Sequence, residues 1–246
     1  MLRRLFLLGL LAVSLFALPI RTQAQSNLAA PNVFRDVSQY HWAASWINQL
    51  YNEGVTGGCS TDPLKYCPDN TVNRAQMAVF LVRVIHGQNF TPPAATTIFG
   101  DVPASHWANR WINQLYTDGV TGGCSTSPLL FCPDAGVSRA QMAVFLLRAV
   151  NGKNYTPPAS GNIFGDVPSN YWAHDWISQF YNAGYTGGCT TSPLNFCPNA
   201  SLSRAQMAVF LLRAIHGTTY SPPAIQLVAP SRSEERRVGK ECRSRW

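Results

Sequence analysis

The sequence predicts a mainly α-helical protein built from three helix–loop–helix repeats. Two observations support this prediction: the same order of residues recurs every 65 positions, and two amphipathic helical patterns fall within each period. The period is visible in four sets of residues, namely Asp36, Asp101 and Asp166; Cys59, Cys124 and Cys189; Cys67, Cys132 and Cys197; and Arg74, Arg139 and Arg204. Because no copy contains an insertion, each should form the same unit, and the units should bury one another's apolar faces.

The first helix of each repeat is expected in a tryptophan-rich segment. In the first copy, Trp42, Trp46 and Leu50 recur at i, i+4 and i+8, which is the pattern of one buried helical stripe. The helix is expected to end at Gly54, since glycine readily adopts the left-handed conformation that closes a helix. This periodicity favours core packing for Trp42, Trp107 and Trp172, although their rings could also serve as flat faces for sugars.

The second helix of each repeat begins at a capping signal. Ser138 and Gln141, like Ser203 and Gln206, have the spacing of a capping box, and Asn73 occupies the cap position in the first copy. An apolar stripe follows in that copy, formed by Met77, Phe80, Leu81, Val84 and Ile85. Strand signals are short and confined to the loops between the helices, and a Pro-Pro pair follows each second helix.

The two ends of the chain differ from the repeats. Residues 1–24 join two arginines, the apolar run 5–18 and a small-residue cleavage pattern, which predicts a secretory signal peptide and no transmembrane segment after cleavage. Residues 229–246 share no spacing with the repeats and resemble translated vector or adaptor sequence; a natural basic tail that binds an anionic surface is the alternative. The expected organisation is signal peptide 1–24, linker 25–33, repeats 34–98, 99–163 and 164–228, and tail 229–246.

Charge and composition exclude several function classes. The formal charge of +7 lies mainly at the two ends, because residues 25–230 hold ten basic and nine acidic residues, so no basic face for nucleic acid is expected. No Ser/His/acid or Cys/His set recurs. Glycoside hydrolysis would need two facing carboxylates, whereas the acids of the repeats recur singly. The sequence therefore predicts neither an enzyme nor a cofactor, and it does not specify an oligomeric state.

Each repeat also carries one Cys-x7-Cys pair. In an exported chain this pattern predicts the disulfides Cys59–Cys67, Cys124–Cys132 and Cys189–Cys197. A metal site is the competing interpretation, but it needs about four ligands. His41 and His106 are equivalent while the third copy has Tyr171, so no threefold His/Cys set exists and no metal is expected. A redox role is disfavoured because Cys-x7-Cys does not have the spacing of a Cys-x-x-Cys motif.

Three arginines, Arg74, Arg139 and Arg204, lie in the first turn of the second helices, where a cation opposes the helix dipole. In one interpretation, free backbone N–H groups and the guanidinium converge on an anion such as a carboxylate or a ketal-linked pyruvate. In the other, each arginine forms an ion pair with Asp36, Asp101 or Asp166. The repeated Gly-Gly pairs, which end at Gly58, Gly123 and Gly188, are expected to provide positive φ, with close backbone approach by a ligand as the second possibility.

These motifs resemble a known family. Phe-x-Asp-Val, Trp-Ala, a helix ending before Gly-Val-Thr-Gly-Gly, and Val-Ser-Arg-Ala-Gln-Met-Ala together resemble the S-layer homology (SLH) domain in three tandem copies, over nearly all of residues 34–220. The resemblance implies a pseudo-threefold helical bundle whose inter-repeat grooves bind a cell-wall polymer, often a pyruvylated polysaccharide. It also favours arginines that line the grooves, each with an aspartate as orienting partner. The cysteine pairs depart from the commonest pattern of the family.

The expected function is therefore that of a secreted, non-catalytic module that anchors to the cell envelope by binding a wall polysaccharide or peptidoglycan-linked polymer. The expected ligand-binding residues are Arg74, Arg139, Arg204, Asp36, Asp101, Asp166, Trp42, Trp107, Trp172, Gly58, Gly123 and Gly188. Two alternatives stay open: an extracellular adhesion module that binds a protein in the same grooves, and the anchor fragment of a larger envelope hydrolase.

Overall fold

The computed structural model describes residues 32–225, and it confirms the mainly α-helical fold. The helices are α1 (Ala44–Asn52), α2 (Arg74–His86), α3 (Asn109–Thr117), α4 (Arg139–Asn151), α5 (His174–Asn182) and α6 (Arg204–His216). Short antiparallel hairpins join β1 (Ser60–Thr61) to β2 (Leu64–Lys65), β3 (Ser125–Thr126) to β4 (Leu129–Leu130), and β5 (Thr190–Thr191) to β6 (Leu194–Asn195). The predicted signal peptide, most of the linker 25–33 and the tail 229–246 lie outside the described residues.

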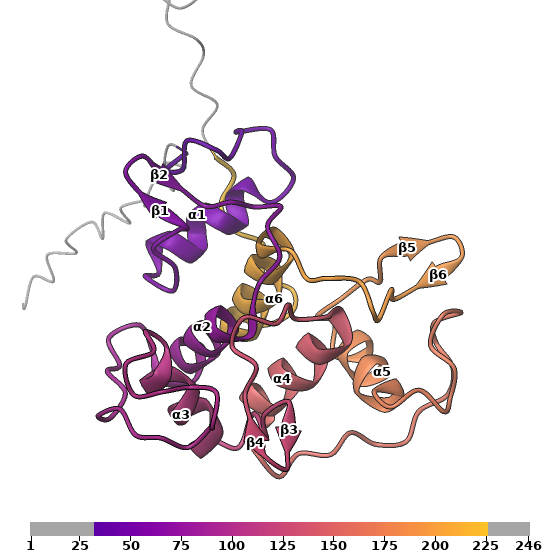
Figure 1. Cartoon of the computed structure of the whole chain (residues 1–246). Helices are drawn as coiled ribbons and strands as arrows, with labels where there is room; N and C mark the ends of the chain where they lie inside the picture. Colours follow the sequence, from indigo (N-terminus) through magenta and orange to yellow (C-terminus); the bar gives the residue numbers. More distant parts are fainter. Residues whose placement is uncertain (1–31, 226–246) are drawn as a thin grey trace, which may run out of the picture.

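The three long helices, α2, α4 and α6, contact one another at the centre of the molecule, and the hairpins lie at its periphery (Figure 1). Each short helix packs against the long helix of a different repeat. The helix α3 packs on α2, α5 packs on α4, and α1 packs on α6. Because α1 and α6 come from the first and the third repeat, their contact closes the arrangement into a cycle.

A closed set of three backbone hydrogen bonds lies where the long helices begin. Val72 N–H donates to the carbonyl oxygen of Leu202 at 3.0 Å, Leu202 N–H to that of Val137 at 2.9 Å, and Val137 N–H to that of Val72 at 2.9 Å. All three side chains are fully buried. Each repeat therefore contributes one donor and one acceptor to its neighbours, and no repeat satisfies these backbone groups by itself.

The capping boxes that the sequence predicts are present on all three long helices. The side chains of Asn73, Ser138 and Ser203 each accept a hydrogen bond from the backbone N–H three residues later, and the backbone N–H of each cap residue donates to the side chain of the glutamine at that position. Because these bonds satisfy N–H groups that a helix start leaves unpaired, they fix where each helix begins. At the other end, each of the three long helices meets a glycine with positive φ.

The prediction that the first tryptophan of each repeat is a core residue is wrong. The helix α1 starts at Ala44, because residues 41–44 form a turn in which Ala44 N–H donates to the carbonyl oxygen of His41 at 2.9 Å. Trp42 belongs to this turn and not to the helical stripe, so its side chain is 62% exposed. Its equivalents Trp107 and Trp172 are 63% and 61% exposed, whereas Ile47 and Leu50 are buried.

Candidate functional site

The loop after each short helix is held by a disulfide and by an aspartate. The predicted pairs Cys59–Cys67, Cys124–Cys132 and Cys189–Cys197 are bonded, with Cα–Cα distances of 6.1, 6.0 and 5.9 Å. In the first repeat, the Asp36 carboxylate accepts hydrogen bonds from the backbone N–H groups of Tyr66 at 2.8 Å and Cys67 at 2.7 Å. Asp101 and Asp166 hold the equivalent residues of their own repeats in the same way.

The carboxylate of Asp36 and the sulfurs of Cys59 and Cys67 lie within 4.8 Å of one another, and the other two repeats repeat the cluster. Both sulfurs are joined in a disulfide, whereas a metal ion is bound by the thiolate form of cysteine. The carboxylate oxygens also already accept two backbone hydrogen bonds. The three side chains therefore lie close together because they hold the loop in place. They do not provide the four ligands of a structural zinc site.

The first-turn arginines reach from one repeat into another. Arg204 is 3% exposed, and its Nε donates to the carbonyl oxygen of Tyr66 at 2.7 Å. Its guanidinium carbon lies 4.7 Å from the centroid of the Tyr66 ring and 5.8 Å from that of Phe80, which adds cation–π attraction. Arg74 and Arg139 bind the carbonyl oxygens of Phe131 and Phe196 in the same manner, at 2.7 and 2.8 Å. The arginine of the third repeat thus binds the first repeat.

The predicted use of free N–H groups at the helix starts is wrong. In α6, Arg204 N–H donates to the carbonyl oxygen of Asn70 at 3.0 Å, and Ala205 N–H donates to that of Pro68 at 2.9 Å. The N–H of Gln206 is taken by the cap residue Ser203. The same pattern occurs at α2 and α4, where carbonyl groups of the neighbouring repeat fill these positions. Backbone groups at these helix starts are therefore occupied by the protein itself.

Within the described residues, arginine and aspartate do not form a direct ion pair either. Across residues 32–225, each ion pair includes a histidine: His86 with Asp118, His174 with Asp175, and His216 with Glu53. The predicted orienting role of the aspartates is indirect, because Asp36 holds the loop whose carbonyl group binds Arg204. Burial lowers the pKa of Arg204, while the charges of Tyr66 and then Asp36 raise it in part.

One nitrogen of each first-turn arginine has no hydrogen-bond partner. The Nη2 atoms of Arg74, Arg139 and Arg204 are buried, and no residue from 32 to 225 accepts a hydrogen bond from them. An unsatisfied donor on a charged, buried group costs about 1–3 kcal/mol or more, and it is relieved when an acceptor arrives. Each of these arginines therefore has one buried N–H group for which residues 32–225 provide no acceptor.

Two of these arginines line grooves between repeats. The first, called groove A, has a volume of about 260 Å³ and includes Thr56, Gly58, Phe80, Arg83, Trp107 and Arg204 in its lining. The second, called groove B, has a volume of about 180 Å³ and includes the equivalent residues Thr186, Gly188, Phe210, Arg213, Trp42 and Arg139. All three repeats contribute to each groove. Groove A receives its loop and α2 from the first repeat, its tryptophan from the second and its buried arginine from the third.

The glycine in each groove is required by the loop. Gly58 has a φ of +88°, and a Cβ atom added to it would collide with the carbonyl oxygen of Lys65. Its N–H donates to the hydroxyl oxygen of Thr56 at 3.1 Å, which fixes the turn. Gly123 and Gly188 have the same conformation, so the prediction of positive φ is confirmed for all three.

The structure brings half of the twelve predicted site residues together in the linings of the two grooves. Arginine, tryptophan and glycine of the predicted set meet in both grooves, whereas the aspartates lie outside the lining of each. Residues of the same types hold the remaining equivalent positions, which are Thr121, Gly123, Phe145, Arg148, Trp172 and Arg74. The second arginine of each groove, Arg83 or Arg213, was missed, although the recurrence of arginine at positions 83, 148 and 213 was a visible signal.

Comparison with known proteins links the chain to the bacterial cell surface. A cell surface protein of Thermoanaerobacter kivui is 30% identical over 205 residues, which are 82% of this chain and 24% of that protein. A cellulosome-anchoring protein of Acetivibrio thermocellus is 28% identical over 63% of this chain and 34% of its own length. An S-layer protein of Bacillus licheniformis is 28% identical over 79% of this chain and 21% of its own length.

The chain thus spans between a fifth and about a third of the length of these relatives. One enzyme is also similar: an endoglucanase of a Bacillus species is 34% identical over 116 residues, which are 47% of this chain and 11% of the enzyme. No protein-family model matches the sequence. Over residues 32–225, none of the helices has the length and apolar character needed to cross a membrane.

Proposed function

We propose that this chain is a non-catalytic SLH-type module that attaches a protein to the cell envelope by binding an anionic wall glycan in its inter-repeat grooves. The names of its relatives, which include a cell surface protein, an anchoring protein and an S-layer protein, support the anchoring role. The closed cycle of contacts among the three repeats supports the pseudo-threefold arrangement that the resemblance implies.

The observation that carries the proposal is the buried arginine with an unpaired N–H group in each groove. A carboxylate or phosphate oxygen of a glycan in the groove would balance the charge of this guanidinium group and accept a charge-assisted hydrogen bond from it. The exposed tryptophan at the same groove supplies a flat apolar face of the kind on which a sugar ring stacks. Together these groups select a ligand that is both anionic and cyclic, and the aspartates would act only by holding the loop.

The same arrangement would repeat around the molecule. Because residue types are identical at the equivalent positions of all three repeats, a third site is proposed at Arg74, Gly123 and Trp172. Several weak sites on one rigid body gain affinity for a polymer with repeated anionic groups, since the second contact becomes intramolecular. A wall polysaccharide has this repeated character, whereas a folded protein surface would have to match each groove separately.

The endoglucanase match gives the hydrolase alternative specific support. It covers 47% of this chain and 11% of the enzyme, so it relates part of this chain to a small part of the endoglucanase. We therefore infer that the repeats attach their host protein to the wall, and that any hydrolytic activity would come from a different part of such a host.

Sedimentation with isolated cell walls tests the proposal. The protein should co-sediment with walls that retain their polysaccharide and should stay in the supernatant with walls from which acid treatment has removed it. Increasing salt should release the bound protein, because a solvent-accessible charge contact is screened. Equal binding to stripped walls, or binding to a wall-associated protein instead, would reject the glycan as ligand.

A further inference from the structure

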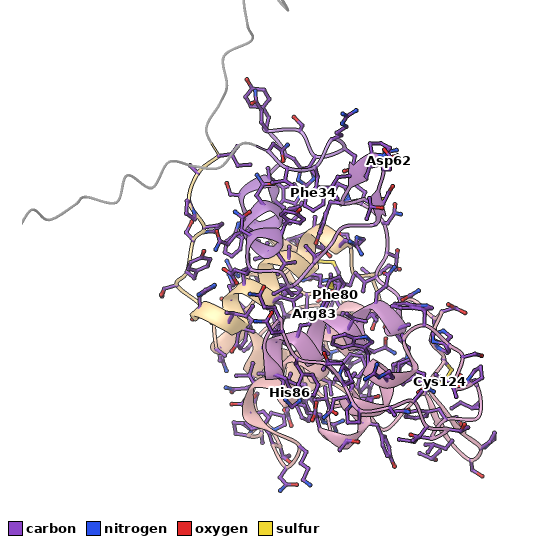
Figure 2. All side chains as sticks on the ribbon, turned by 90° about the vertical axis from the view of Figure 1, so that its left-hand side faces the viewer. Phe34, Asp62, Phe80, Arg83, His86 and Cys124 are labelled. Atoms are coloured by element: carbon purple, nitrogen blue, oxygen red, sulfur yellow. A yellow bond between two sulfur atoms is a disulfide. The ribbon has the colours of Figure 1, made fainter. Side chains whose placement is uncertain are left out.

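Each groove contains a second arginine that the proposed ligand contacts do not use. Arg83 lies in the lining of groove A, and Arg213 has the equivalent place in groove B. Each follows the first-turn arginine of its own long helix by nine residues, as Arg148 does on α4. Figure 2 shows Arg83 on α2 between Phe80 and His86.

Arg83 is held by the protein without having all its donors satisfied. Its Nη1 donates to the carbonyl oxygen of Val55 at 2.8 Å, and its guanidinium carbon lies 5.3 Å from the centroid of the Trp111 ring. Its Nε is buried and has no hydrogen-bond partner in the described part of the chain. These contacts fix the position of the guanidinium group while one donor still lacks an acceptor.

Arg213 repeats this arrangement in groove B. Its Nη1 donates to the carbonyl oxygen of Tyr185 at 2.8 Å, its guanidinium carbon lies 5.6 Å from the centroid of the Trp46 ring, and its Nε is likewise buried and unpartnered. The combination therefore occurs in two repeats, and Arg148 shares with them the contact with a tryptophan ring, at 5.1 Å from the centroid of Trp176.

The two arginines leave each groove with a surplus of positive charge. The lining of groove A includes Arg83 and Arg204 but no aspartate or glutamate, and that of groove B includes Arg139 and Arg213 and again no acid. Burial lowers the pKa of both Arg83 and Arg213. Since arginine keeps its proton in proteins, the charge stays and requires an anion.

We propose that Arg83, Arg148 and Arg213 contact the ligand, so that each groove binds a glycan unit with two negative charges. This inference rests on the proposed function and specifies the ligand class of the same grooves. Phe80 lies near Arg204 and precedes Arg83 by about one helical turn, so the two cations meet the ligand at different points. Both volumes are below the roughly 300–1,000 Å³ of ordinary ligand pockets, so each groove suits a small unit of a polymer.

The first test replaces the second arginine of each groove. This second-row variant, Arg83→Gln/Arg148→Gln/Arg213→Gln, is titrated calorimetrically with isolated wall polysaccharide. Binding should weaken about tenfold or more, the effect of losing a charge-assisted hydrogen bond. The control is Arg35→Gln/Arg110→Gln, which removes two exposed arginines outside both grooves and should bind like the parent. A folded second-row variant with parental affinity would overturn the inference.

A comparison with the first-turn arginines separates this inference from the proposed function. If the variant Arg74→Gln/Arg139→Gln/Arg204→Gln loses binding and the folded second-row variant does not, the function stands and the second contact is rejected. If neither variant loses binding, the function itself fails.

Competition by small anions tests the charge of the ligand. At constant ionic strength, malonate should displace wall polysaccharide from the parent at about a tenfold lower concentration than acetate, as expected if a second charge-assisted contact forms. In the second-row variant the preference for malonate over acetate should fall to about twofold, because malonate carries two carboxylate groups and acetate carries one. An equal potency of the two anions on the parent would reject the doubly anionic ligand.

A measurement on the unaltered protein covers the case in which the second-row variant does not fold. With arginine labelled by nitrogen-15, the Nε–H signals of Arg83 and Arg213 should shift when wall polysaccharide fragments are added, while those of Arg35 and Arg110 stay in place. Unchanged Arg83 and Arg213 signals at saturation would overturn the inference.

Discussion

Arg204 and Tyr66 bind each other reciprocally, although they are 138 residues apart in the sequence. The Nε of Arg204 donates to the carbonyl oxygen of Tyr66 at 2.7 Å, and the Tyr66 hydroxyl donates to the carbonyl oxygen of Arg204 at 2.8 Å. The pair joins the last repeat to the first, and it places a groove arginine at the same time. In the other two repeats phenylalanine replaces the tyrosine, so the second hydrogen bond is specific to this junction.

The variant Tyr66→Phe should lower the free energy of unfolding by about 1 kcal/mol, because a buried hydrogen bond is lost while the ring stays. Denaturant unfolding provides the measurement. The change Tyr116→Phe, on a tyrosine that is 38% exposed, serves as control and should have little effect. A Tyr66→Phe protein as stable as the parent would show that the hydroxyl does not stabilise the junction.

Removing a helix cap should also destabilise the protein. The change Ser203→Ala deletes the side chain that accepts from Gln206 N–H at 3.2 Å, and such a loss costs about 0.5–2 kcal/mol. The exposed loop residue Ser105 provides a matched control, since Ser105→Ala removes a hydroxyl group outside any helix. Thermal unfolding of both variants should separate them, and equal melting temperatures would contradict the role of the capping box.

The disulfides should be present in the exported protein and should stabilise it. Mass spectrometry of non-reduced peptides should recover Cys59–Cys67, Cys124–Cys132 and Cys189–Cys197. The variant Cys124→Ala/Cys132→Ala should lose roughly 2.5 kcal/mol of stability, the loop-closure value for nine residues. Free thiols at these positions in protein recovered from the cell envelope would refute the assignment.

The exposed tryptophans should matter for binding and not for stability. Trp107→Ala should weaken binding to wall polysaccharide but leave the free energy of unfolding within about 0.5 kcal/mol of the parent value, as for most surface substitutions. Tyr40→Ala is the control, because Tyr40 is 77% exposed and lies outside the lining of both grooves. A loss of stability without a loss of binding would assign Trp107 a structural role instead.

Local signals in the sequence predicted local structure well. The cap residues before each long helix and the cysteine pairs could be predicted because each depends on residues close together in the chain, and the repeat period could be predicted because the same residue types recur at a fixed spacing. The exposure of Trp42 could not be predicted in this way. The helical periodicity suggested that Trp42 belongs to the helix, but α1 begins at Ala44 and Trp42 lies in the turn before it.

Contacts between repeats could not be predicted from sequence patterns. The arginine motif correctly indicated an unusual charge at the helix start. However, the partner of Arg204 is the backbone carbonyl group of Tyr66, which lies 138 residues away in the sequence. Backbone acceptors leave no signature in residue types. For the same reason the sequence could not show that carbonyl groups from the neighbouring repeat occupy the N–H groups of these helices.

Calorimetric titration of the protein with isolated wall polysaccharide tests the central claim most directly. The parent should bind, and the folded variant Arg74→Gln/Arg139→Gln/Arg204→Gln should bind about tenfold more weakly or worse, since each substitution removes a charge-assisted donor. Should this variant fail to fold, Trp42→Ala/Trp107→Ala/Trp172→Ala replaces it in the same titration. A parent protein that does not bind the polysaccharide, or a folded variant that binds it as tightly as the parent, would contradict the account.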